Sequence, residues 1–225
     1  MRLVIDHLTR MGGMRICVAG ISRSNGHVRP LPTDGQLFRS EIPGTWALGR
    51  VLEIGATKDV GSAPRFEDRE FKLANVLQIE TLTPAAFWAT LRDTAESDLS
   101  SLFGDDFSVN ANRKGFVMPG GGVASLGILA PQDKPTLFQD YDGNPRLRLT
   151  DGSVTVDCSI TDVRLRKSDN VTLVASAVTE LRTLIRESNR ILLSVGLTYP
   201  WPPTAPKHWL QVNNIHCSSS PLWRA

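Results

Sequence analysis

The residues best suited to chemistry gather in the last long stretch of the chain, Arg190 to His216. Two runs with strand character, 191–198 and 208–215, flank a segment with prolines at positions 200, 202, 203 and 206. Because proline fixes φ and cannot donate to a β-ladder, we expect this segment to be a stiff, extended connection. The stretch also holds two of the five tryptophans, a tyrosine and two of the four histidines. Aromatic and hydrogen-bonding side chains on strands and a rigid loop suit recognition better than catalysis.

The sequence contains no G-x-S-x-G, H-E-x-x-H or P-loop pattern, and the glycine-rich run 119–122 lacks the lysine of a P-loop. His208, His216 and Cys217 form the sharpest metal-binding candidate. On a regular strand, however, the two histidines lie roughly 26 Å apart, which is too far to share one ion. Acidic pairs such as Glu67-Asp68 would suit a Mg²⁺-dependent hydrolase, although such pairs are more often solvated loop charges. We therefore predict no catalytic residue, no metal and no cofactor.

Length and composition indicate an ordinary globular chain. With 225 residues, 41% of them hydrophobic, the chain can bury a sizeable core. No apolar run reaches the roughly 18 residues of a membrane helix, and charged residues interrupt the start, so we expect neither a membrane partner nor secretion. Three widely spaced cysteines fit a reducing cytoplasm. The net charge of +2 divides into two basic ends and an acidic middle, and arginine outnumbers lysine. A GC-rich genome explains that arginine excess better than a nucleic-acid partner does, because composition alone rarely identifies a partner.

The elements that must position the candidate residues are mostly short strands. In the first part we expect strands at 2–8, 14–22, 27–31, 50–56 and 76–80, with a hairpin turn at Ser24-Asn25-Gly26. Thr83 is a suitable N-cap for a helix that Gly104 ends. The later strands are expected at 123–130, 136–141, 146–150 and 153–167, the last with a bulge near Thr161. A second helix is expected over 171–188, before the closing stretch.

Three parts of this pattern carry a resemblance to a known family. The runs MRICVAGIS–GHVRPL, RLRLTDGSVTVDCSITDVRLR and LLSVGLTYPWPP–HWLQVNNIH resemble the bacterial dual-OB-domain proteins, a poorly characterised family. The resemblance implies a mainly β fold with helices (α+β), made of two OB-like small β-barrels. We place the first barrel at 1–82, a helix and a glycine-rich connecting loop at 83–122, and the second barrel with one helix at 123–225. Nucleic-acid binding is implied only by analogy with other OB-folds.

An OB surface binds single strands by stacking bases on aromatic side chains and by contacting phosphates with Arg and Lys. Trp201, among prolines, is the better exposed tryptophan, whereas Trp209, inside a strand, is better explained by packing. The arginines fit equally well as a solvated strand face or as ion-pair partners of Asp162 and Asp169. The predicted nucleic-acid-binding residues are Arg23, His27, Arg29, Arg164, Arg166, Tyr199, Trp201 and His208.

These observations favour a non-catalytic nucleic-acid-binding protein, an accessory to a larger bacterial system. The expected partners are single-stranded DNA or RNA and a protein of that system. A scaffold that binds another protein or a small ligand is the alternative, and a metal-dependent hydrolase is the third hypothesis. Affinity that falls steeply with salt would separate the first hypothesis from the second.

Overall fold

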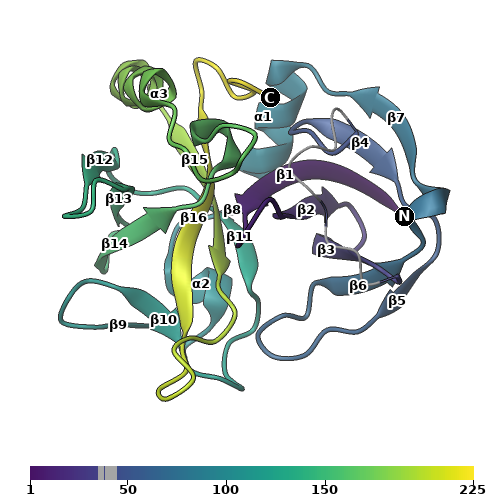
Figure 1. Ribbon diagram of the computed structural model, residues 1–225, viewed down its shortest axis with the longest axis horizontal. Helices are drawn as coiled ribbons and strands as arrows, with labels where there is room; N and C mark the ends of the chain where they lie inside the picture. Colours follow the sequence, from purple (N-terminus) through teal and green to yellow (C-terminus); the bar gives the residue numbers. More distant parts are fainter. Residues whose placement is uncertain (35–37, 39–44) are drawn as a thin grey trace.

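The strands form two sheets, one in each half of the chain. The computed structural model describes residues 1–34, 38 and 45–225. In Figure 1 the first sheet lies on the right and the second on the left, and β1 runs from the N-terminus to β16 at their junction. The fold is mainly β with a few helices, and the sheet curls into a half-barrel. An α+β class is therefore confirmed.

The first sheet has the strand order β5-β6-β3-β2-β1-β4-β7. Its strands pair antiparallel except β3 and β6, which are parallel. The hairpin between β2 and β3 forms as predicted, with Gly26 at a φ of 65° that L-residues rarely adopt. The strands are β1 (Arg2–Arg10), β2 (Ile16–Ser22), β3 (Gly26–Pro32), β4 (Arg50–Glu53), β5 (Thr57–Asp59), β6 (Asp68–Phe71) and β7 (Leu77–Thr81), and a 3₁₀ turn, η1 (Leu73–Asn75), precedes β7.

The second sheet has the order β12-β13-β14-β16-β15-β11-β8, and β10 pairs with both β16 and β9. The two predicted strands of the closing stretch are confirmed as β15 and β16, which pair antiparallel around the proline-rich connection. The strands are β8 (Ala95–Glu96), β9 (Ser108–Val109), β10 (Gly115–Val117), β11 (Leu126–Leu129), β12 (Thr136–Gln139), β13 (Pro145–Thr150), β14 (Thr155–Ile160), β15 (Ile191–Leu197) and β16 (His208–Cys217).

The predicted helix from Thr83 to Gly104 is two helices. Thr83 caps α1 (Pro84–Asp93) as expected, since its hydroxyl accepts a hydrogen bond from the Ala86 amide at 3.2 Å. The chain then forms β8, which pairs in parallel with β11, and α2 (Leu99–Phe103) starts at a new cap, Asp98. Sequence periodicity missed this break because the apolar residues on both sides keep helical spacing.

The predicted strand 153–167 was also too long. β14 ends at Ile160, and the chain turns through a 3₁₀ helix, η2 (Val163–Leu165). The cause is Asp162, whose carboxylate accepts a hydrogen bond from the Arg164 amide at 3.0 Å. Such an Asx turn competes with the strand ladder. The second predicted helix is confirmed as α3 (Ala175–Glu187), although it starts four residues later than expected.

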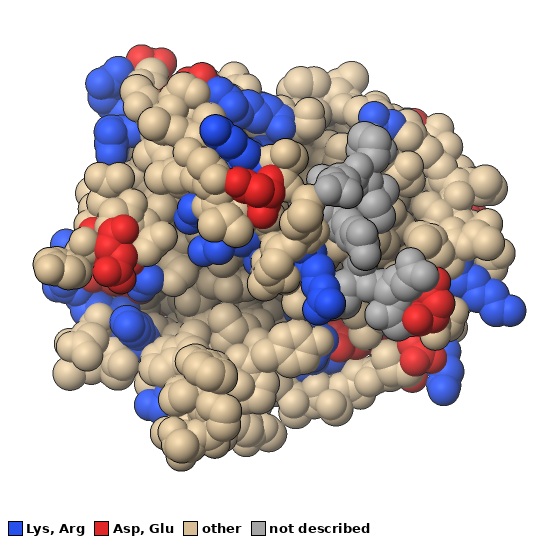
Figure 2. Space-filling view, in the orientation of Figure 1, with Lys and Arg blue, Asp and Glu red and all other residues tan. Residues whose placement is uncertain are grey.

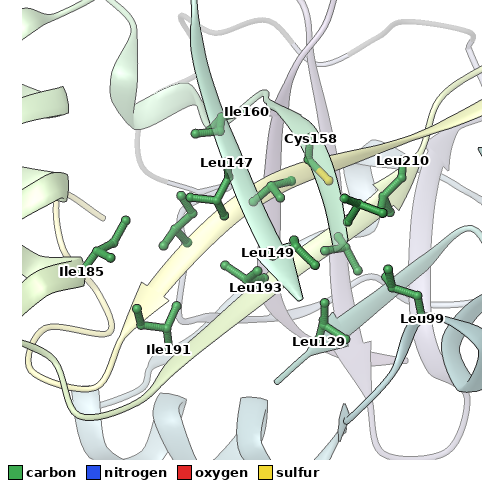
Figure 3. Packing of buried hydrophobic residues seen from close by; sticks show 14 of the residues in the cluster. Leu99, Leu129, Leu147, Leu149, Cys158, Ile160, Ile185, Ile191, Leu193 and Leu210 are labelled. Carbon is green, nitrogen blue, oxygen red and sulfur yellow. The ribbon is translucent and has the colours of Figure 1, made fainter. Parts of the chain in front are cut away.

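Each half has its own hydrophobic cluster. The cluster of the second half packs β11 and β13–β16 against α3, and Figure 3 shows Leu147, Leu149 and Leu193 interdigitating within it. The cluster of the first half includes Phe87 and Leu91 of α1 and reaches Leu192 of the other half. Helix α1 therefore packs against the first sheet and contacts the second half. Within the described ranges, no helix is long and apolar enough to cross a membrane.

Buried hydrogen bonds join β1 to the second half. Asn214 is fully buried, and its side-chain oxygen accepts from the Leu8 amide at 2.6 Å while its amide nitrogen donates to the Leu8 carbonyl at 3.3 Å. The Ser194 hydroxyl donates to the Asp6 carbonyl at 2.8 Å. Both contact regions coincide with register shifts, between Ile5 and His7 in β1 and between residues 194 and 195 where β15 pairs with β16. The irregular backbone frees polar groups that a regular ladder would use.

Candidate nucleic-acid interface

A cleft between the two sheets is the best-formed candidate site among the described residues. It encloses about 210 Å³ and is lined from one side by β1, β2 and β3 and from the other by β11, β15 and β16. An apolar cavity of about 150 Å³ already admits benzene, so this one has room for a single planar ring system. Its floor is mostly apolar, and its polar side chains are Thr9, Arg10, Cys17, Arg29, Arg65, Thr198, Tyr199, Gln211 and Asn213.

Arg29 holds one wall of the cleft in place. Its guanidinium is buried, 2.7 Å from the Asp68 carboxylate and 2.9 Å from the Ser125 hydroxyl of the other half. The adjacent Glu67 carboxylate accepts hydrogen bonds from the amides of Ser125 and Leu126 at 2.5 and 2.9 Å. A predicted phosphate ligand is therefore already fully engaged, and its visible role is to fix the 61–68 loop against the second half.

Tyr199 lies at the mouth of the cleft with its ring partly covered. The Arg65 guanidinium sits 4.0 Å from the ring centroid, a cation–π contact, and is held by Asp68 at 2.8 Å. The tyrosine is 57% exposed all the same. A flat aromatic face beside a guanidinium plane is the pairing on which nucleic-acid bases stack in single-strand-binding proteins.

Arg10 supplies positive charge to the lining of the cleft. Its Nε is buried and finds no hydrogen-bond partner in the described part of the chain. Burial and the charge of Arg10 lower the pKa of Arg166, although Asp169 acts in the opposite direction, so two guanidinium groups lie close enough to repel. Arg166 donates one hydrogen bond, to the Val171 carbonyl at 2.7 Å. Such a pair is an energetic cost that a bound anion would relieve.

A second group of aromatic side chains lies beyond the cleft on β10, β16 and the proline-rich connection. Lys207 lies over Phe116 at 3.9 Å and over Trp209 at 5.4 Å. The Trp209 indole donates to the Trp201 backbone carbonyl at 2.7 Å. Trp201 itself is 64% exposed. Figure 2 shows a hollow near the middle of this face, with Lys and Arg side chains around it.

The remaining predicted residues do not share one surface. Arg23 is exposed in the β2–β3 turn, whereas His27 points inward at Asp6, 3.3 Å away. Arg164 is buried in a two-pronged ion pair with Asp162, with nitrogen–oxygen distances of 2.9 and 2.6 Å. His208 is buried and donates from Nδ1 to a backbone carbonyl at 2.8 Å. Arg164 and His208 therefore present no free donor to a surface ligand.

The fold thus brings together Arg29 and Tyr199 of the predicted set, with Arg166 beside Arg10 and Trp201 beyond the cleft. Sequence reasoning missed Arg10, Arg65, Gln211 and Asn213, which belong to elements distant in sequence. Arg10 ends a strand with four apolar residues among nine, and nothing in that pattern singled it out. Arg65 follows a loop proline and gave no signal.

Comparisons with known proteins give no relative from which a function could be carried over. No family model matches the chain, and no curated protein matches it.

Proposed function

We propose that this protein binds single-stranded nucleic acid along the face that joins the cleft to the exposed tryptophan. One base enters the cleft beside Tyr199, and the next stacks on Trp201. The observation that carries the proposal is the cleft itself: a ring-sized apolar cavity with an aromatic ring under a guanidinium at its mouth. Backbone phosphates are neutralised by Arg10, whose Nε has no hydrogen-bond partner among the described residues, and by Arg166 beside it.

The proposed architecture is two OB-like barrels, as the sequence resemblance implies. In its support, β1–β2–β3 form a meander, β1 also pairs with β4, and β3 pairs in parallel with β6. These pairings are what a partly open five-stranded barrel needs. We further propose that the protein works in a reducing cytoplasm with a protein partner of a bacterial system, since its three cysteines are unpaired.

The test is fluorescence anisotropy with labelled single-stranded DNA and RNA oligomers at several salt concentrations. Stacking is worth about 1–3 kcal/mol per base, so Tyr199→Ala and Trp201→Ala should each weaken binding by about 5- to 150-fold. The matched control is Tyr141→Ala, because Tyr141 is fully exposed on the β12–β13 turn at the far edge of the second sheet. An equal loss in all three variants, or no binding at low salt, would refute the proposal.

The proposed phosphate contacts can be tested through the salt dependence of binding. Each contact with a single strand contributes about 0.7 to the slope of log K against log salt, so Arg10→Ala should reduce the slope by about that amount. Arg186→Ala is the control, since Arg186 lies on the solvent-exposed face of α3 and pairs with Glu187. An unchanged slope in Arg10→Ala would remove this arginine from the interface.

The mostly apolar, ring-sized cleft also favours a second function, binding of a free mononucleotide. Competition distinguishes the two. A mononucleotide that displaces the labelled oligomer at equal concentration would assign the cleft to a small ligand. An oligomer that binds at least 100-fold more tightly would support binding along a strand.

A further inference from the structure

Three side chains of the first sheet converge on one buried point away from the cleft. The Asp6 carboxylate lies 2.8 Å from Nδ1 of His7 and 3.3 Å from Nε2 of His27. One ligand atom from each residue lies within 4.8 Å of the other two. Asp6 and His7 come from the irregular segment of β1, and His27 comes from β3, across β2. In β2, Ala19 is paired with His7 and Ile21 with His27.

The hydrogen-bonding state of His7 makes this cluster unusual. Its Nε2 lies 3.2 Å from the Val195 carbonyl oxygen, which can only accept, so Nε2 carries the hydrogen. Nδ1 of His7 faces the Asp6 carboxylate, which has no donor of its own, so a proton on Nδ1 or a cation held between the two groups must satisfy this contact. Neither Asp6 oxygen, nor Nδ1 of His7, nor Nε2 of His27 makes a hydrogen bond of good geometry in the described part of the chain.

A metal cation between these atoms would accept the lone pairs of all three side chains. Two ligands about 2.1 Å from a metal ion, at angles of 90–109°, lie about 3.0–3.4 Å apart, close to the two distances that Asp6 makes. Only the His7–His27 separation must fall into the same range. The backbone contact at Nε2 of His7 is the outer-shell partner that commonly fixes a metal-binding imidazole.

We propose that Asp6, His7 and His27 bind one divalent transition-metal ion, with Zn²⁺ as the reference ion. Two imidazoles and one carboxylate suit Zn²⁺ and its neighbours better than Mg²⁺ or Ca²⁺, which prefer oxygen ligands throughout. Asp6 and His7 are buried and the His27 side chain is only 12% exposed, so the ion is structural. It clamps β1 to β3, the strands that carry Arg10 and Arg29 to the cleft. The proposal does not rest on nucleic-acid binding.

The test uses the full-length chain, freed of metal by a chelator and then titrated with Zn²⁺ and, separately, with Co²⁺. We expect one ion per chain, visible d–d absorption with Co²⁺, and a Tm raised by about 5–10 °C when free Zn²⁺ is 100-fold above its Kd. His27→Gln should weaken Zn²⁺ binding at least 100-fold and abolish the shift. His208→Gln should leave both unchanged, because His208 binds a backbone carbonyl elsewhere.

Three results would overturn the proposal: no Zn²⁺-dependent shift in the wild type, equal Zn²⁺ affinity in His27→Gln, or equal losses in both variants. If His27→Gln does not fold, X-ray absorption of the Zn²⁺-loaded wild type decides. Two imidazole ligands without sulfur support the site. A sulfur ligand places the zinc on a cysteine and refutes it.

Discussion

Acidification from pH 7.5 to 5.0 should destabilise this fold through one residue, His216. The histidine is fully buried, and its Nε2 contacts the Ser194 hydroxyl at 2.9 Å. Burial, reinforced by the charge of Arg164, lowers its pKa from 6.5 to about 3, although Asp6 and Asp162 act in the opposite direction. In the folded protein the ring is therefore neutral at both pH values, whereas in the unfolded chain it becomes protonated near pH 6.5.

The sign and size of the effect follow from proton linkage. His216 is charged only when it is protonated, and its pKa is lower in the folded protein than in the unfolded chain. It therefore stabilises the fold fully above pH 6.5, and this contribution is lost as pH falls from 6.5 towards 3. Between pH 7.5 and 5.0 the unfolded state gains nearly one proton that the folded state does not, which costs about 2 kcal/mol. Burial alone would raise the pKa of Asp6, but the neighbouring His7 and His27 hold it well below its usual range, so Asp6 changes stability only below about pH 4.

The assay is urea denaturation of the wild type and His216→Gln at both pH values. Glutamine keeps an N–H donor near the position of Nε2, so the variant can still reach Ser194. The loss of unfolding free energy on acidification should be about 2 kcal/mol smaller in the variant than in the wild type. Contributions of the other histidines cancel, since both proteins share them. An equal loss in the two proteins would refute the assignment of the pH dependence to His216.

Three further changes test the junction of the halves and the cleft. Asn214→Ala should destabilise the fold by about 3 kcal/mol in urea denaturation, because the amide and carbonyl of Leu8 lose their partner in a buried place. Arg164→Leu should cost about 3–5 kcal/mol in the same assay, because it leaves the buried Asp162 carboxylate without its counter-charge. In the native protein a small alkylating reagent should modify only Cys17, which lines the cleft, and a nucleic-acid oligomer should slow that reaction.

Each of these three predictions has a matched control. Asn25→Ala, in an exposed turn, and Arg186→Leu, in an exposed ion pair, should each change stability by less than about 1 kcal/mol. Mass spectrometry should find Cys158 and Cys217 unmodified until denaturant is added, because burial raises their thiol pKa values to about 12 and 11. Losses as large in the exposed variants as in the buried ones, or native labelling of all three thiols, would contradict these expectations.

Local sequence determined the parts of the fold that depend on short-range chemistry. Alternation and turn residues identified the β2–β3 hairpin and the strands β15 and β16, and a Thr-Pro pair located the start of α1. Where a side chain competes with the backbone ladder, as Asp162 does after β14, periodicity alone extended a strand too far.

The candidate sites were decided by tertiary structure. The sequence could not show that Arg29 meets the buried Asp68 carboxylate, because the two residues lie on different strands. It left open whether Arg164 pairs with Asp162, and the tertiary structure decided this by burying both side chains. Adjacent Asp6 and His7 looked like an interruption of an apolar start. Only the pairing of β1 and β3 with the same strand, β2, brings His27 within reach of them, and strand pairing is a property of the tertiary structure.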